Sequence, residues 1–132
     1  MKTIKVAAAI IERDGKLFAT QRKGGEFAGL WEFPGGKVEP GETPQQALHR
    51  EIMEELEVEV KITRHLMTIE YDYPSFHLSM DCYLCALVSE TIPHLNVHTA
   101  GRWITPSEAS EMRFLPADDE LLQMLQEKSY LR

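Results

Sequence analysis

Three glutamates, Glu51, Glu54 and Glu55, are spaced so that one face of a helix would present all their carboxylates. At about 100° per residue they share an arc of about 100°, and Glu55 lies only about 20° from an apolar stripe. That stripe consists of Leu48, Ile52 and Leu56. Like charges at this spacing repel, at about 0.2–0.5 kcal/mol per pair. A divalent cation would relieve the repulsion, because carboxylate oxygens are hard ligands; the alternative is a solvated acidic helix face.

Residues near this helix offer the means to bind an anion beside the cation. Gly35 and Gly36 let the backbone approach a ligand closely, and a carbonyl there could join a metal shell. Mg²⁺ held by one or two carboxylates takes phosphate oxygens as further ligands. Arg22 and Lys23 supply positive charge for such a phosphate. These residues together indicate a site for a metal-bound phosphate compound.

The charge balance excludes some classes of function. The chain has 132 residues and a net charge of −7, and residues 39–59 hold seven glutamates and one arginine. An acidic balance argues against binding duplex nucleic acid, which needs a basic face. No apolar run approaches the ~18 residues of a membrane span, and residues 1–5 lack the apolar region of a secretory signal. We therefore expect a soluble, cytoplasmic, globular domain without membrane association.

The elements that must position these residues follow from apolar patterning and turn signals. Strands are predicted at 6–11, 17–22, 58–73 (one or two strands), 76–88 and 102–104, and helices at 44–57, 107–112 and 118–128. Thr43, Pro44 and Gln46 form a helix start with a capping box. Residues 23–42 read as a loop, and a loop of that length in so small a domain is more often functional than not. The mixture predicts an α+β fold, a mixed sheet with helices packed on it.

The two cysteines are expected to be structural. Cys82 and Cys85 lie in an apolar run that reads as a strand. An odd offset along a strand points the two thiols to opposite faces. We therefore expect buried, reduced thiols instead of a disulfide or a zinc site.

A longer pattern surrounds the three glutamates. Gly36 is followed by Glu42 after five residues, and then by the run from Arg50 to Val58 after seven more. This arrangement, at 36–58, resembles the Nudix box, G-x5-E-x7-R-E-U-x-E-E-x-G-U. The one departure is Glu57, where the family has a glycine that ends the helix in the left-handed conformation. The segments 30–37, 69–74 and 115–118 are similar to MutT-type enzymes and their CTP pyrophosphohydrolase relatives, so the resemblance covers 1–132 as a single domain.

The resemblance implies a fold and an activity. The fold would be the Nudix α/β/α sandwich, with a mixed β-sheet between helices. The activity would be Mg²⁺-dependent hydrolysis of (deoxy)nucleoside triphosphates to the monophosphate and pyrophosphate, with Mn²⁺ able to substitute. Nucleotide-pool sanitation, a form of DNA repair, is the expected role and 8-oxo-dGTP the first substrate to test; CTP or a modified dCTP is the alternative. A non-catalytic nucleotide-sensing module is an alternative of another class. The chain would act as a monomer or homodimer.

The resemblance also assigns residues. The cation would be held by Glu51, Glu54, Glu55 and a carbonyl of Gly35 or Gly36. Catalysis would depend on Glu51, Glu54 and Arg50, with Arg50 holding the carboxylates in position, while Glu42 would do likewise or bind a further ion. Phosphates would be bound by Arg22 and Lys37. The family's further loop acid is missing, so the general base would be Glu51 or His98, unless His98 is simply exposed. The base would be bound by Tyr73, Leu115, Asp118 and Asp119, with Phe27 and Phe76 as further wall candidates; alternatively, Asp118 only caps the last helix.

Overall fold

The structure is a computed structural model that describes residues 1–90 and 93–127. Its strands are β1 (Thr3–Arg13), β2 (Lys16–Arg22), β3 (Trp31–Glu32), β4 (Gly35–Lys37), β5 (Val60–Tyr73), β6 (Phe76–Leu87) and β7 (His98–Ile104). Its helices are α1 (Pro44–Leu56), α2 (Pro106–Ala109) and α3 (Pro116–Glu127). The strands form one mixed sheet in the order β3-β2-β1-β6-β5, with β4 added on β1 and β7 on β2.

Strand β1 is the centre of the sheet and changes partner along one edge. On one side it runs parallel to β6, from the Thr3–His77 pair to the Ile11–Cys85 pair. On the other side its residues 6–8 pair with β4 and its last two residues pair with β2. Between these two partners the backbone N–H of Ala9 donates to the carbonyl of Pro34 over 2.8 Å. Because β1 and β2 separate at this point, residues 32–36, at the junction of β3 and β4, lie between them.

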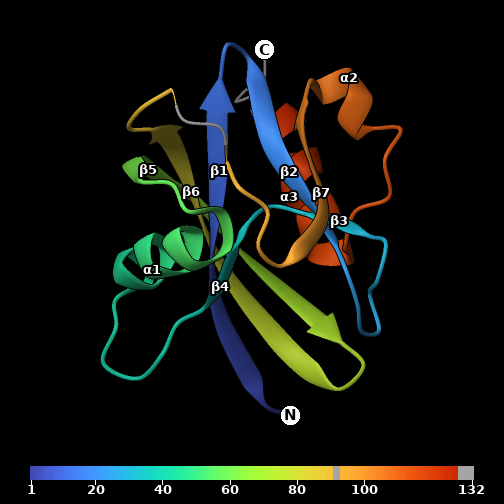
Figure 1. Cartoon of the computed structure of the whole chain (residues 1–132). Helices are drawn as coiled ribbons and strands as arrows, with labels where there is room; N and C mark the ends of the chain where they lie inside the picture. Colours follow the sequence, from blue (N-terminus) through green and yellow to red (C-terminus); the bar gives the residue numbers. More distant parts are fainter. Residues whose placement is uncertain (91–92, 128–132) are drawn as a thin grey trace.

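Alternate residues of β1 enter two separate cores. Ala7, Ala9 and Ile11 pack with α1, whereas Ala8 and Ile10 pack with α3. Because successive side chains of a strand point to opposite faces, the two helices cover opposite faces of the sheet (Figure 1). The α+β class and the α/β/α sandwich predicted above are confirmed.

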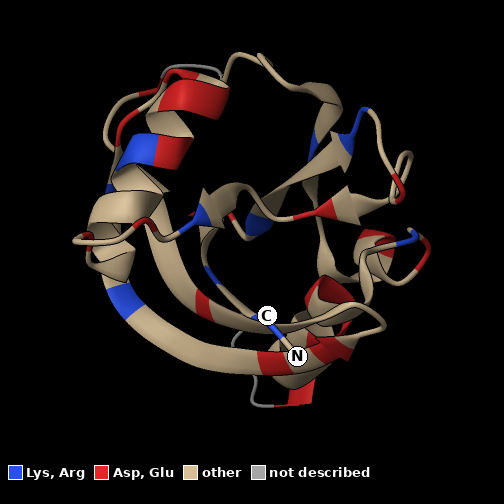
Figure 2. Ribbon diagram, turned by 90° about the horizontal axis from the view of Figure 1, so that it is seen from below, with Lys and Arg blue, Asp and Glu red and all other residues tan. Residues whose placement is uncertain are grey.

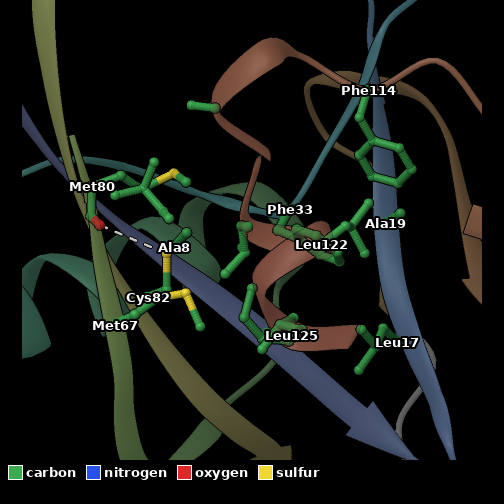
Figure 3. Close-up of a cluster of buried hydrophobic side chains, with 14 of the residues drawn as sticks. Ala8, Leu17, Ala19, Phe33, Met67, Met80, Cys82, Phe114, Leu122 and Leu125 are labelled. Carbon is green, nitrogen blue, oxygen red and sulfur yellow. Dashed lines mark hydrogen bonds between the residues drawn. The ribbon is translucent and has the colours of Figure 1, made fainter. Parts of the chain in front are cut away.

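The two cysteines also divide between the cores, as expected. Cys82 packs on the α3 side, where its thiol lies near the carbonyl of Met80 (Figure 3). Cys85 packs on the α1 side. Both are free, and burial raises the pKa of each thiol, that of Cys85 to about 12. A high pKa keeps them in the unreactive thiol form.

Several predicted boundaries were wrong. The loop at 23–42 contains β3 and β4, whose two and three residues carry no periodicity and depend on neighbouring strands for their pairing. The strand predicted at 102–104 begins at His98, because β7 pairs with almost all of β2. The helix predicted at 107–112 ends at Ala109, and the last helix begins two residues before Asp118; its predicted end at 128 lies outside the described residues.

Among the described residues, no helix has the length and apolar character required to cross a membrane.

Candidate active site

Helix α1 presents its carboxylates beside an apolar face that is fixed in the core. Leu48, Ile52 and Leu56 are fully buried against the sheet, as the stripe predicted. The helix begins with the predicted capping box, in which Thr43 Oγ1 accepts from the Gln46 backbone and the Gln46 side chain accepts from Thr43 N–H. It ends at Leu56, one residue earlier than predicted. Glu57 has φ 54° and ψ 37°, the left-handed conformation that the family's glycine would adopt.

Arg50 is the centre of an ionic network on this helix. It donates to Glu42 from Nε over 2.8 Å and from Nη2 over 2.9 Å, and to Glu51 from Nη1 over 2.7 Å. Glu54 lies 3.5 Å from the same Nη1 atom. Figure 2 shows these charges as blue and red bands on α1. The Arg50 guanidinium lowers the pKa of Glu42 to about 2, and Glu42 and Glu51 together raise the pKa of Arg50. The expected positioning role of Arg50 therefore has a geometric basis.

Glu55 points inward and has a different environment. Burial, together with the carboxylates of Glu51 and Glu32, raises its pKa to about 8. Its Oε1 atom is buried and has no hydrogen-bond partner. A buried carboxylate oxygen without a partner is costly. The like-charged neighbours and the unpaired oxygen are both features that a bound cation would relieve.

Gly35 and Gly36 allow the backbone of β4 to lie directly against the Glu51 side chain and the backbone of β1. A Cβ atom at Gly36 would collide with the Glu51 carboxylate, and one at Gly35, where φ is +154°, would collide with the Ala7 carbonyl. Within residues 1–90 and 93–127, no three His, Cys, Asp or Glu side chains converge closely enough to hold a metal ion. Glu51 and Glu54 instead face Arg50. The available donors are nevertheless carboxylate and carbonyl oxygens, the set that suits Mg²⁺, so the residues fit that ion.

A cavity of about 780 Å³ adjoins these residues. That volume is within the usual range for small-molecule sites. Its charged part is lined by residues predicted for the cation and phosphates together with Glu32 and His98, namely Arg22, Glu32, Gly35, Gly36, Lys37, Glu51, Glu55 and His98. Glu54 is 59% exposed and does not line it. The structure therefore brings most of the predicted phosphate and metal residues to one cavity.

The remaining part of the cavity is aromatic and apolar. Tyr73 stacks on Phe76 at 5.0 Å between ring centroids and meets Phe27 edge-on at 5.6 Å. Leu115 lines the same part. The Tyr73 hydroxyl accepts from the backbone N–H of Ala117 over 3.2 Å, which fixes the ring against the start of α3. Such a wall can stack a flat base.

Asp118 lies in this part of the cavity and Asp119 does not. Asp118 is 5% exposed, and its Oδ1 accepts from the backbone N–H of Phe33 over 3.0 Å. Burial raises its pKa to about 8. It does not cap α3, because that helix begins at Pro116. Asp119 is exposed, and its Oδ2 accepts from Gln123 over 3.2 Å, so the structure places it outside the cavity lining.

Two polar residues were missed or misjudged from the sequence. Glu32 was noted only within a segment, yet its Oε1 accepts from Arg22 over 3.1 Å inside the cavity. The sequence signal that could have identified Glu32 is a single carboxylate between two aromatic residues, Trp31 and Phe33. The expectation that His98 is simply exposed was wrong: its side chain is 5% exposed, and Nε2 lies 3.5 Å from Glu32 Oε2. The Nδ1 atom of His98 is buried without a partner.

Comparison with known proteins agrees with the family resemblance seen in the sequence. A family model described as the NUDIX domain matches residues 6–124. The chain is 40% identical to a CTP pyrophosphohydrolase of Escherichia coli, over 93% of this chain and 91% of that protein. It is 38% identical to an 8-oxo-dGTP diphosphatase of Haemophilus influenzae, over 94% and 92%. A solution structure of the E. coli ORF135 protein superposes with a TM-score of 0.81 at 37% identity, covering 96% of this chain and 92% of that one.

Proposed function

Because this chain belongs to the Nudix hydrolases, we propose that it hydrolyses (deoxy)nucleoside triphosphates to the monophosphate and pyrophosphate with Mg²⁺. The observation that carries the proposal is one cavity with two different parts. Arg22, Lys37, Glu51 and Glu55 line the charged part, and Tyr73 with Asp118 lines the aromatic part. A triphosphate and a base are the two chemical groups that these parts suit.

The cation would be held by Glu51, Glu54, Glu55 and a carbonyl of Gly35 or Gly36. When bound, it would neutralise phosphate charge and lower the pKa of an attacking water. Arg50 keeps the side chains of Glu51 and Glu54 near one another through its Nη1 atom. Such positioning of ligands is a recurrent need in metal sites.

The chain's own cations act on the phosphates. Arg22 lies at the end of β2 and is held by Glu32, so its charge has a fixed position beside the cavity. It would neutralise phosphate oxygens as charge shifts in the transition state. Lys37 would bind a further phosphate oxygen from β4. Glu51 is the proposed general base, with His98 as the alternative.

The protonation of Asp118 bears on the choice of base. With a pKa of about 8, its carboxyl group is mainly protonated at neutral pH. A protonated carboxyl donates a hydrogen bond, which suits an acceptor on an oxidised purine. We therefore propose 8-oxo-dGTP as the first substrate. The second candidate is CTP, favoured by the 40% identity to a CTP pyrophosphohydrolase.

A panel of nucleotides tests the proposal. Release of pyrophosphate would be measured with Mg²⁺ for 8-oxo-dGTP, dGTP, CTP, dCTP and 5-methyl-dCTP. We expect kcat/KM to be highest for 8-oxo-dGTP, and a maximum at CTP would support the second candidate. Binding of nucleotides without any pyrophosphate release would identify a sensing module instead and would contradict the proposed hydrolysis.

A further inference from the structure

The C-terminal end of α1 is completed by a segment that lies some forty residues later in the chain. The last four carbonyls of a helix have no partner within the helix. In α1 these belong to residues 53–56. The first accepts from the backbone N–H of Glu57 over 3.1 Å. The other three accept from the 94–98 segment: Glu54 from Asn96 Nδ2 over 2.8 Å, Glu55 from Asn96 N–H over 3.1 Å, and Leu56 from His94 N–H over 2.8 Å.

This end of α1 depends on stabilising contacts from outside the helix. Glu57 adopts the left-handed conformation, which is strained for an L-residue. Glu54 and Glu57 add negative charge where the helix dipole is already negative, and the last turn has no basic residue. Donors directed at the carbonyls offset part of this repulsion. Asn96 supplies two of them, one from its side chain and one from its backbone.

The same segment is also attached to the opposite wall of the cavity. Leu95 packs against the core beneath α1, near Phe18 and Gly101. His98 is buried with its Nε2 atom 3.5 Å from Glu32 Oε2, and Glu32 in turn holds Arg22. The five residues from 94 to 98 therefore connect the carboxylate-bearing turn of α1 to the group that holds Arg22.

We propose that Asn96 is a positioning residue for the hydrolysis: its side-chain amide fixes the last turn of α1, and the 94–98 segment thereby sets Glu54 and Glu55 relative to Glu32 and Arg22. The main-chain atoms bonded to Asn96 belong to Glu54 and Glu55 themselves, so holding them fixes the origin of both side chains. The inference rests on the proposed function, because it assigns a role in that reaction.

The test compares Asn96→Ala with Thr63→Ala. Thr63 is the matched control, because its Oγ1 also donates to a main-chain carbonyl, that of Leu84, over 2.9 Å, on the exposed side of β5. Three quantities would be measured: hydrogen exchange at the amides of residues 57, 94 and 96, Mn²⁺ affinity of the nucleotide-free protein by electron paramagnetic resonance, and kcat and KM.

For Asn96→Ala we expect faster exchange at these amides and a loss of about tenfold in Mn²⁺ affinity and in kcat, as for other residues that orient metal ligands. The KM for the nucleotide should change less than about twofold, since Asn96 does not line the cavity. Thr63→Ala should leave all three measurements unchanged. Equal behaviour of the two variants would overturn the proposal.

A second variant separates positioning from simple loss of stability. Adding Glu57→Gly to Asn96→Ala removes the strain of a non-glycine residue in the left-handed conformation and so raises the stability of the protein. We expect this pair to regain thermal stability and not Mn²⁺ affinity; recovery of both would overturn the positioning role. If the wild-type protein hydrolyses nothing, the proposed function fails, while hydrogen exchange and Mn²⁺ affinity still decide whether Asn96 orders this turn.

Discussion

The backbone N–H of Phe33 donates a hydrogen bond to Asp118 Oδ1 over 3.0 Å, across 85 positions of sequence. Phe33 directly follows β3, and Asp118 lies in the first turn of α3. The bond uses one oxygen of the carboxyl group. Because Asp118 is among the residues that line the cavity, its other oxygen is the atom we expect to meet a base.

Replacing Asp118 should alter the preference among bases. We expect Asp118→Ala to reduce discrimination by roughly the 1–3 kcal/mol of a buried hydrogen bond, while the rate on the poorest substrates stays nearly intact. The measurement is kcat/KM for each nucleotide of the panel. Asp119→Ala is the control, because Asp119 is exposed. An unchanged order of preference in Asp118→Ala would show that the residue only supports the fold.

Removing a carboxylate of α1 should slow hydrolysis. We expect Glu54→Gln and Glu55→Gln each to lower kcat at least ~10²-fold, since each would remove a ligand of the cation. Excess chelator should abolish the activity of the wild-type protein, and added Mg²⁺ should restore it. Full activity in chelator would rule out the metal site.

Glu55 should also make stability depend on pH. Its folded pKa of about 8 lies above the ordinary value of 4.5. As pH rises from about 4.5 to about 8, the unfolded chain loses this proton and the folded chain keeps it, so this group lowers the free energy of unfolding over that range. The glutamine in Glu55→Gln does not titrate, so by pH 8 this variant should exceed the wild-type protein by about 1–3 kcal/mol in the free energy of unfolding. Urea unfolding in chelator checks this; Glu54→Gln, 59% exposed, should show no such rise.

Glu57→Gly should stabilise the protein. The left-handed conformation costs an L-residue about 1–2 kcal/mol, which glycine avoids. Glycine in turn destabilises the folded state by about 0.5–1 kcal/mol, because it has more freedom to lose from the unfolded chain. We expect a net gain of about 0.5–1 kcal/mol in the free energy of unfolding. Denaturant unfolding measures it. A loss of stability would mean that the Glu57 side chain contributes more than its backbone conformation costs.

His77 should stabilise the β5–β6 hairpin at low pH. Its Nδ1 lies 2.6 Å from Asp72 and its Nε2 2.8 Å from Glu70, and these hydrogen bonds raise its pKa above 6.5. The stabilisation is full below the unfolded value of about 6.5 and is lost as pH rises through the higher folded value. The Tm difference between wild type and His77→Gln should therefore shrink from pH 5.5 to 9. His49→Gln, on the exposed face of α1, is the control, and a constant difference would contradict the prediction.

The parts of the fold that follow from local pattern were predictable. The apolar stripe and capping box located α1 with an error of one residue. The strands predicted at 6–11 and 17–22 flank Asp14 and Gly15, a turn-forming pair in which both residues have positive φ. These features depend on neighbours within a few positions. The left-handed Glu57 was also predictable, because the family pattern places a glycine there.

The rest depends on contacts between distant segments. The two and three residues of β3 and β4 become strands only because β1 and β2 separate there. Glu32 and His98 meet across β2, which pairs with both of their strands. Local sequence around His98 gives no sign of burial, so its inward position could not be inferred.

The parallel pairing of β1 with β6 sets an order for folding on the ribosome. Thr3 pairs with His77, and at about 5–20 residues per second the second strand follows the first by roughly 4–15 s. During that interval β4 and α1 can already pack on β1, but the edge of β1 that pairs with β6 has no strand partner. Pairing of such distant segments is slow. The nascent chain therefore exposes that edge of its central strand until β6 is made, and this edge is where we expect chaperones to bind and aggregation to begin.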